Sequence, residues 1–135
     1  MRKKNKKITL SGNSRKKADP LKITMARILF FLSAVLWLAY GVYIYYDMAI
    51  TNNNKSSADV VTLFSIVNAG LFLFSGIKFG GTQKWFYYFA LAVTALNLLL
   101  SLFNIVDLYF LVSFLIDMLI LWAILPLYKN YLSTP

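Results

Sequence analysis

The sequence predicts an all-α fold: a four-helix transmembrane bundle with a disordered basic N-terminal tail. Hydrophobic residues make up 59% of the chain and charged residues only 14%, whereas soluble domains carry about 25% charged residues. Four long apolar segments fill residues 24–127 of the 135. Each segment is close to the length of about 20 residues that a helix needs to cross a hydrocarbon core.

The tail, residues 1–18, is polar and basic and has no hydrophobic period. Such a composition cannot bury a core, so we expect it to be disordered and distinct from a transmembrane domain at residues 19–131. Ten of the fourteen Lys and Arg residues lie in the first 27 positions. Beside a membrane span, basic residues stay cytoplasmic and attract anionic lipid headgroups. We therefore expect the tail to contact lipid and not nucleic acid.

The first span is predicted at about residues 24–48. Asp19 suits the N-cap of this helix and Pro20 its first helical position. The polar segment at residues 51–55 provides the loop that follows.

The second span is predicted at about residues 59–78. Ser56 and Asp59 resemble a capping box at its start. Gly80 and Gly81 form a strong stop signal, because glycine tolerates the left-handed conformation that ends many helices.

The third and fourth spans are predicted at about residues 84–104 and 107–127. Thr82 is the expected cap of the third helix and Asp107 that of the fourth. The few residues between these spans predict a very tight helical hairpin.

The distribution of charge predicts the orientation. If the N-terminus is inside, the inner segments hold thirteen basic residues and the outer loops hold one, Lys55. The positive-inside rule then places both termini in the cytoplasm of a multi-pass cell-membrane protein.

Small and polar residues share one face of the third span, at a spacing of four and three. They are Ala90, Thr94, Asn97, Ser101 and Asn104. Inside a membrane, small residues allow close helix approach and polar ones bond across helices. This face indicates a packing interface or a polar pathway, and packing is the preferred interpretation.

Asp117 is the one charged residue inside the fourth span, near its middle. An aspartate there costs about 2.5–3.5 kcal/mol on insertion scales and normally faces the bundle interior. With no basic residue at this depth, we expect hydrogen bonds from Asn68, Ser113 or Tyr40. Together with Asn97 these residues form a candidate intramembrane polar site. Three interpretations stay open: a neutral structural acid, a proton or cation site, or a partner for a basic residue of another subunit.

The residue types argue against an enzyme. The chain has no His and no Cys, and its Ser and Thr residues lack an identifiable base. We expect no catalytic, metal-binding or cofactor-binding residues. The leading expectation is a structural or accessory membrane subunit, in a homo-oligomer or a larger membrane complex. The alternative is a subunit of a proton- or cation-coupled transporter or channel that uses Asp117.

Four segments carry a resemblance, at residues 31–41, 75–78, 85–88 and 128–131. In them the chain resembles small four-span prokaryotic integral membrane proteins of unknown function. This resemblance implies a four-helix fold in a membrane and no activity.

Overall fold

The computed structural model describes residues 19–81 and 83–132, and this part of the chain is helical throughout apart from short turns. The elements are α1 (Pro20–Tyr45), the π-helical η1 (Tyr46–Thr51), α2 (Lys55–Lys78), α3 (Lys84–Phe103), α4 (Leu108–Ile124), the 3-10 helix η2 (Leu125–Leu127) and α5 (Tyr128–Leu132). The expected all-α fold of four packed helices is confirmed. The tail at residues 1–18 lies outside the described residues.

Four segments are long and apolar enough to cross a membrane. They are Pro20–Thr51, Lys55–Lys78, Lys84–Phe103 and Leu108–Tyr131. Many large apolar side chains face outward along these helices, among them Val42, Leu63 and Phe103, each more than 60% exposed. Because such a surface is stable only in lipid, the chain is a small multi-pass membrane protein.

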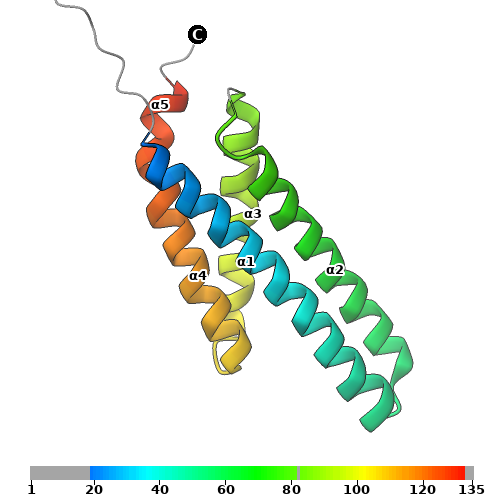
Figure 1. Cartoon of the computed structure of the whole chain (residues 1–135). Coiled ribbons are helices and arrows are strands. Elements are labelled where there is room, and N and C mark those ends of the chain that lie inside the picture. Colours follow the sequence, from blue (N-terminus) through cyan, green and yellow to red (C-terminus); the bar gives the residue numbers. More distant parts are fainter. Residues whose placement is uncertain (1–18, 82, 133–135) are drawn as a thin grey trace, which may run out of the picture.

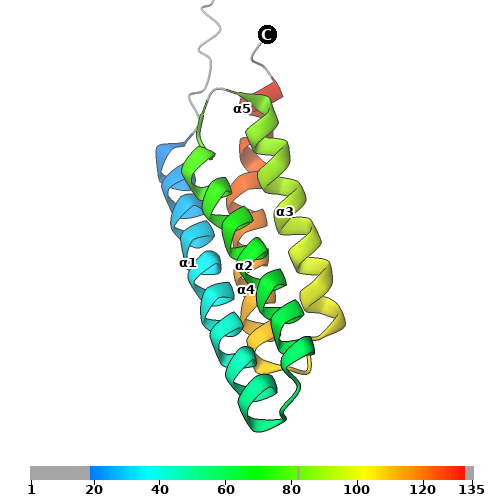
Figure 2. The ribbon, with the colours of Figure 1, turned by 90° about the vertical axis from the view of Figure 1, so that its right-hand side faces the viewer.

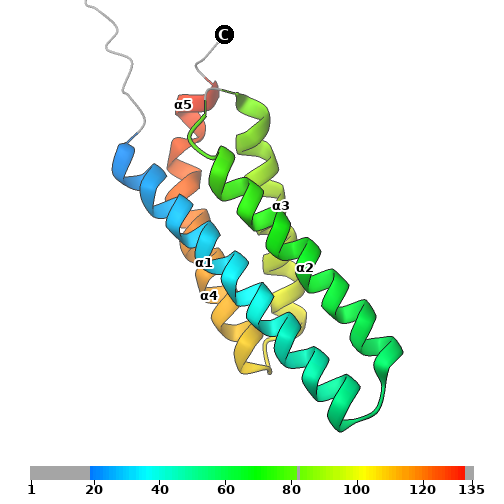
Figure 3. The same ribbon diagram turned by 45° about the vertical axis from the view of Figure 1, so that its right-hand side comes forward.

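The helices form two antiparallel hairpins, α1 with α2 and α3 with α4 (Figure 1). The hairpins meet mainly where α4 lies against α1, whereas α2 and α3 make little contact (Figure 3). The α1–α2 and α3–α4 turns lie at one end of the bundle, called here the loop end. Asp19, Gly80 and α5 lie at the other, the terminal end. At the loop end the α1–α2 hairpin extends beyond the α3–α4 hairpin (Figure 2).

Two predicted helix caps are confirmed. The Asp19 carboxylate accepts a hydrogen bond from the Leu21 backbone N–H at 3.0 Å, and Asp107 accepts one from the Tyr109 N–H at 2.9 Å. Each bond satisfies one of the free N–H groups in a first helical turn.

The predicted start of α2 is wrong. Its cap is Asn54, whose side-chain oxygen accepts from the Ser57 N–H at 3.3 Å. The helix therefore begins at Lys55, and Ser56 and Asp59 do not form the expected capping box. The polar loop holds several residues able to cap, and only the path of the chain selects among them.

The stop after α2 is confirmed at Gly80, which has φ of 90°. Helix α3 begins after Gln83, which makes no side-chain capping bond. Thr82, the expected cap, lies outside the described residues. Helix α4 stops at Ile124 and continues as η2, which contains Pro126; proline there cannot donate to the helical ladder.

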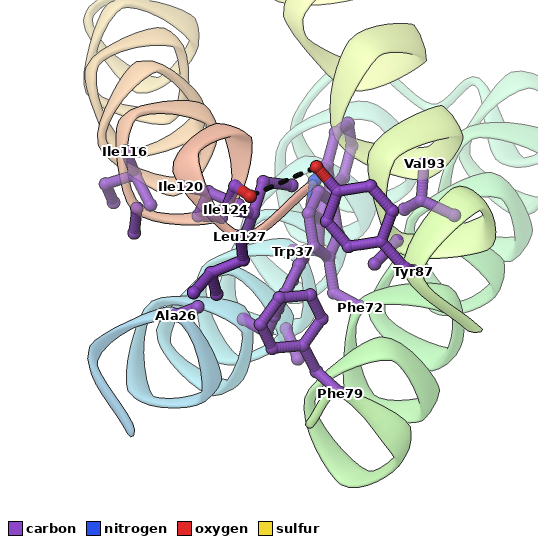
Figure 4. Packing of buried hydrophobic residues seen from close by; sticks show 14 of the residues in the cluster. Ala26, Trp37, Phe72, Phe79, Tyr87, Val93, Ile116, Ile120, Ile124 and Leu127 are labelled. Carbon is purple, nitrogen blue, oxygen red and sulfur yellow. Dashed lines mark hydrogen bonds between the residues drawn. The ribbon is translucent and has the colours of Figure 1, made fainter. Parts of the chain in front are cut away.

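Hydrophobic side chains from all four helices pack together between the helices (Figure 4). The Phe30 ring lies 6.3 Å from that of Phe72 and 5.6 Å from that of Phe79, between centroids. Small residues bring α1 and α2 close: a Cβ on Gly41 would lie only 3.0 Å from the Ser65 Cβ. Such approach supplies the van der Waals contact that holds helices together in lipid.

Candidate intramembrane polar site

Asp117 lies fully inside the bundle, with no exposed surface. It belongs to the inward face of α4, where Ser113, Ile116 and Ile120 are also buried at helical spacing. Its Oδ2 accepts a hydrogen bond of 2.6 Å from the Nδ2 of Asn97. The carboxyl group is thus held by an amide of the neighbouring helix α3.

The Asn97 amide joins α3 to two residues of α4. The same Nδ2 also donates to the Ser113 Oγ at 3.1 Å. Asn97 is 1% exposed, and Ala90, Thr94 and Ser101 are fully buried. Four residues of the expected face thus point inward, whereas the fifth, Asn104, is exposed. Thr94 bonds within its own helix, where its hydroxyl donates to the Ala90 carbonyl at 2.8 Å.

None of the three expected donors to Asp117 bonds to its carboxyl. The Ser113 Oγ accepts from the Asn97 Nδ2 instead. Asn68 is buried, but its Nδ2 has no hydrogen-bond partner among the described residues. Tyr40 is half-buried, and its ring stacks on Tyr109 at 4.2 Å between centroids. The expectation that Asn68, Ser113 or Tyr40 donates to the Asp117 carboxyl was wrong. The donor is Asn97.

The error has a geometric cause. Counting positions within each span assumes that all four helices are centred at one depth. The α1–α2 hairpin instead extends further at the loop end (Figure 2). Asn68 lies one turn from Phe64, whose ring packs 5.9 Å from that of Trp37. Trp37 in turn lies 5.7 Å from Tyr109, at the start of α4. These contacts place Asn68 closer to the loop end than Asp117.

Six buried side-chain polar atoms have no hydrogen-bond partner among the described residues, and two of them belong to Asp117 and its partner Asn97. They are Trp37 Nε1, Asn68 Nδ2, Asn97 Oδ1, Ser101 Oγ, Tyr109 OH and Asp117 Oδ1. We call these six atoms the unpartnered set. Buried polar groups in proteins are nearly always paired with protein or ordered water. The set mixes donors and acceptors, so water molecules could bridge its members.

Tyr109 is a member of the unpartnered set that the candidate site predicted from sequence does not include. Its ring packs against Trp37, Tyr40 and Phe110, and its hydroxyl is buried. A signal was present, because residues 109, 113 and 117 are spaced by four and share one face of a helix.

The site does not resemble a metal centre. Among residues 19–81 and 83–132, no group of three or more His, Cys, Asp or Glu residues could hold a metal ion. Asp117 contributes one carboxylate, and its neighbours contribute amides and hydroxyls. The arrangement can hold a proton, and it can hydrogen-bond water.

Comparison with models of protein families, with curated proteins and with solved structures found no match. The resemblance to small four-span membrane proteins therefore identifies no family. The fold and the site define the class of this chain, a small multi-pass membrane protein with a polar cluster buried among its helices.

Proposed function

We propose that this protein is a structural or accessory subunit of a membrane assembly and has no enzymatic activity. The observation that carries the proposal is the inward use of its polar groups. The Asn97 amide fastens α3 to α4 through Ser113 and Asp117, while the outward faces of the spans carry large apolar side chains. The polar residues thus join the helices to one another, and the exterior of the bundle is apolar. This arrangement supports a scaffold that binds other membrane components through its lipid-facing surface.

The proposal extends to location and partners. We place the protein in the cell membrane with both termini cytoplasmic, on the strength of the thirteen-to-one distribution of basic residues. Its surroundings are the bilayer, with anionic headgroups at the basic tail. A second copy or another membrane subunit would cover part of the apolar exterior.

A second candidate is a subunit of a proton- or cation-coupled transporter or channel that uses Asp117. The observation that favours it is the unpartnered Asp117 Oδ1, which lies buried with five other polar atoms without partners. Ionisable residues inside membranes mark ion or proton pathways in many proteins.

Reconstitution separates the two candidates. The purified chain in liposomes is tested for proton, sodium and potassium flux, with Asp117→Asn as the matched control. In parallel, cross-linking in native membranes measures the mass of the assembly. We expect flux no higher than in protein-free liposomes, and one cross-linked species of discrete mass. Flux that Asp117→Asn abolishes while the bundle stays folded would replace the accessory role with transport.

A further inference from the structure

We propose that water reaches Asp117 from the loop end only, so that its carboxyl exchanges protons with the aqueous phase on that side of the membrane. One-sided access goes beyond an accessory role. It would hold whether the subunit transports ions or only responds to them.

The unpartnered set is distributed unevenly along the bundle. Helix α4 runs from the loop end to the terminal end, so Tyr109 precedes Asp117 on the loop side. Helix α3 runs the opposite way, and Asn97 bonds to Asp117; Ser101 is therefore one turn closer to the loop end. Trp37 and Asn68 lie near the start of α4, through the ring contacts of Trp37 with Tyr109 and Phe64. All six atoms lie level with Asp117 or on its loop side.

The chemistry of the set suits water. Trp37 Nε1 and Asn68 Nδ2 donate, Asn97 Oδ1 accepts, and the Ser101 and Tyr109 hydroxyls do both. Each would keep an uncompensated desolvation cost if it stayed without a partner. A buried water makes about three hydrogen bonds, so a few water molecules can satisfy all of these atoms.

A depression in the surface lies at the same end. The Tyr40 ring, stacked on Tyr109 at 4.2 Å, also lines a depression of about 550 Å³. Asn104 and Asp107, both exposed, line the same depression. Phe103, Val106 and Phe110 complete its lining. Tyr40 thus borders the depression and stacks on Tyr109, a member of the unpartnered set, so movement of the stacked rings would connect the two.

The terminal side of Asp117 is sealed. Ile120 and Ile124 of α4 are fully buried, and Leu127 is 2% exposed. The Tyr87 hydroxyl is paired, because it donates to the Ile124 carbonyl at 3.1 Å (Figure 4). The Ser75 hydroxyl, also on this side, donates to the carbonyl of Leu71. Buried polar groups here are paired, and apolar side chains fill the rest.

The exchange is a simple proton transfer. The O–H bond of the Asp117 carboxyl breaks as a water oxygen takes the proton and becomes hydronium. The carboxylate left behind keeps its hydrogen bond from Asn97. The nearest titratable group on the loop side is Tyr109 of α4, and Tyr40 of α1 is stacked on it. Helix α3 presents the Asn97 amide. Tyr87 of α3 lies toward the terminal end, bonded to the backbone of α4.

Cysteine accessibility tests the proposal directly, because the full chain contains no cysteine. Single variants Ser101→Cys and Ser113→Cys probe the loop side of Asp117. Ala90→Cys and Ala123→Cys, equally small and buried, are matched controls on the terminal side. Each variant in proteoliposomes meets a membrane-impermeant, positively charged thiol reagent on one side at a time. Asn53→Cys and Lys129→Cys report which side carries the loop end.

We expect Ser101→Cys and Ser113→Cys to react from the side that modifies Asn53→Cys. The rate should exceed that from the other side by at least about tenfold, or about 1.4 kcal/mol in the barrier to access. Ala90→Cys and Ala123→Cys should stay unmodified. Equal reaction from both sides, or none at Ser101→Cys and Ser113→Cys while folded, would overturn the proposal.

If a cysteine variant fails to fold, infrared spectroscopy of the unmodified chain provides a second measurement. The carboxyl stretch of Asp117 is assigned by its loss in Asp117→Asn. We expect it to respond to pH steps on the loop side and not on the terminal side. A response to steps on the terminal side, or to neither, would contradict one-sided access.

Discussion

A single amide group organises the centre of this bundle. Asn97 Nδ2 has two hydrogens, and each finds an acceptor on α4, one at Ser113 and one at Asp117. It is the only hydrogen-bond partner that the described residues give to the Asp117 carboxyl. The energetic importance of Asn97 should therefore exceed that of a typical polar residue in a membrane helix.

We predict that Asn97→Leu lowers the free energy of unfolding in detergent by about 1–3 kcal/mol, because it leaves a buried acceptor without a donor. The average for one intramembrane hydrogen bond is only about 0.6 kcal/mol. The matched control is Asn104→Leu, an exposed amide that bonds only to the Leu100 carbonyl; it should change little. Equal effects of the two variants in denaturant titrations would show that the Asp117 contact is energetically unimportant.

Adding Asp117→Leu to Asn97→Leu tests the same contact from the other partner. The double variant removes the orphaned carboxyl along with its donor, so it should be more stable than Asn97→Leu alone. Strictly additive losses in this double-mutant cycle would count against coupling between the two residues.

At the scale of elements, close backbone approach holds the α1–α2 hairpin together. Gly41 faces Ser65 so tightly that a Cβ would come within 3.0 Å of the serine Cβ, whereas Gly70 has open space on its side of α2. The two glycines are both helical, which makes them a matched pair.

We predict that Gly41→Ala destabilises the bundle by about 1–3 kcal/mol through overpacking. Gly70→Ala should be neutral or stabilising, because alanine is the better helix former by about 0.5–1 kcal/mol. Adding Ser65→Gly to Gly41→Ala should recover most of the loss. The test is thermal unfolding of the unmodified chain, the two single glycine variants and the double variant in one detergent. A Gly41→Ala variant as stable as Gly70→Ala would refute the overpacking prediction.

The turn after α2 depends on a different property of glycine. Gly80 has φ of 90°, and a Cβ there would lie 2.7 Å from the Ile23 Cγ2. We predict that Gly80→Ala costs about 1–2 kcal/mol in unfolding free energy from the left-handed backbone alone. The contact with Ile23 adds to this. The double variant Gly80→Ala/Ile23→Ala removes the contact with Ile23, so only the cost of the left-handed backbone should remain. If this double variant were as stable as Ile23→Ala alone, the whole effect of Gly80→Ala would come from the contact.

The elements show which features could be predicted from sequence. Local chemistry predicted the Asp19 and Asp107 caps and the Gly80 stop, because each depends on residues adjacent in the chain. The start of α2 was missed because Asn54 and Ser56 can both cap and lie two residues apart. The partner of Asp117 was missed because it depends on how far one hairpin is displaced along the other, which no local pattern encodes.

For the whole molecule, charge and helix direction combine into a prediction of topology. Both turns of the hairpins lie at the loop end, and five of the six described Lys and Arg residues lie toward the terminal end, with Lys55 the exception. We predict that Asn53→Cys and Lys129→Cys label from opposite sides of the native membrane, with Lys129→Cys cytoplasmic. Labelling of Asn53→Cys from the cytoplasm would reverse the orientation.

The unequal lengths of the hairpins have a consequence for the surrounding bilayer. Helix α1 has 26 residues and α3 has 20, so at 1.5 Å per residue they measure about 39 Å and 30 Å. A bilayer of uniform hydrocarbon thickness cannot match both lengths if both helices lie parallel to the membrane normal. The longer α1–α2 hairpin is therefore expected to tilt more than the α3–α4 hairpin. Bilayers of shorter acyl chains are thinner and would increase this tilt. The increased tilt would strain the interface between α2 and α3, where the two helices make little contact. The packing of the two hairpins should therefore depend on the acyl-chain length of the host membrane.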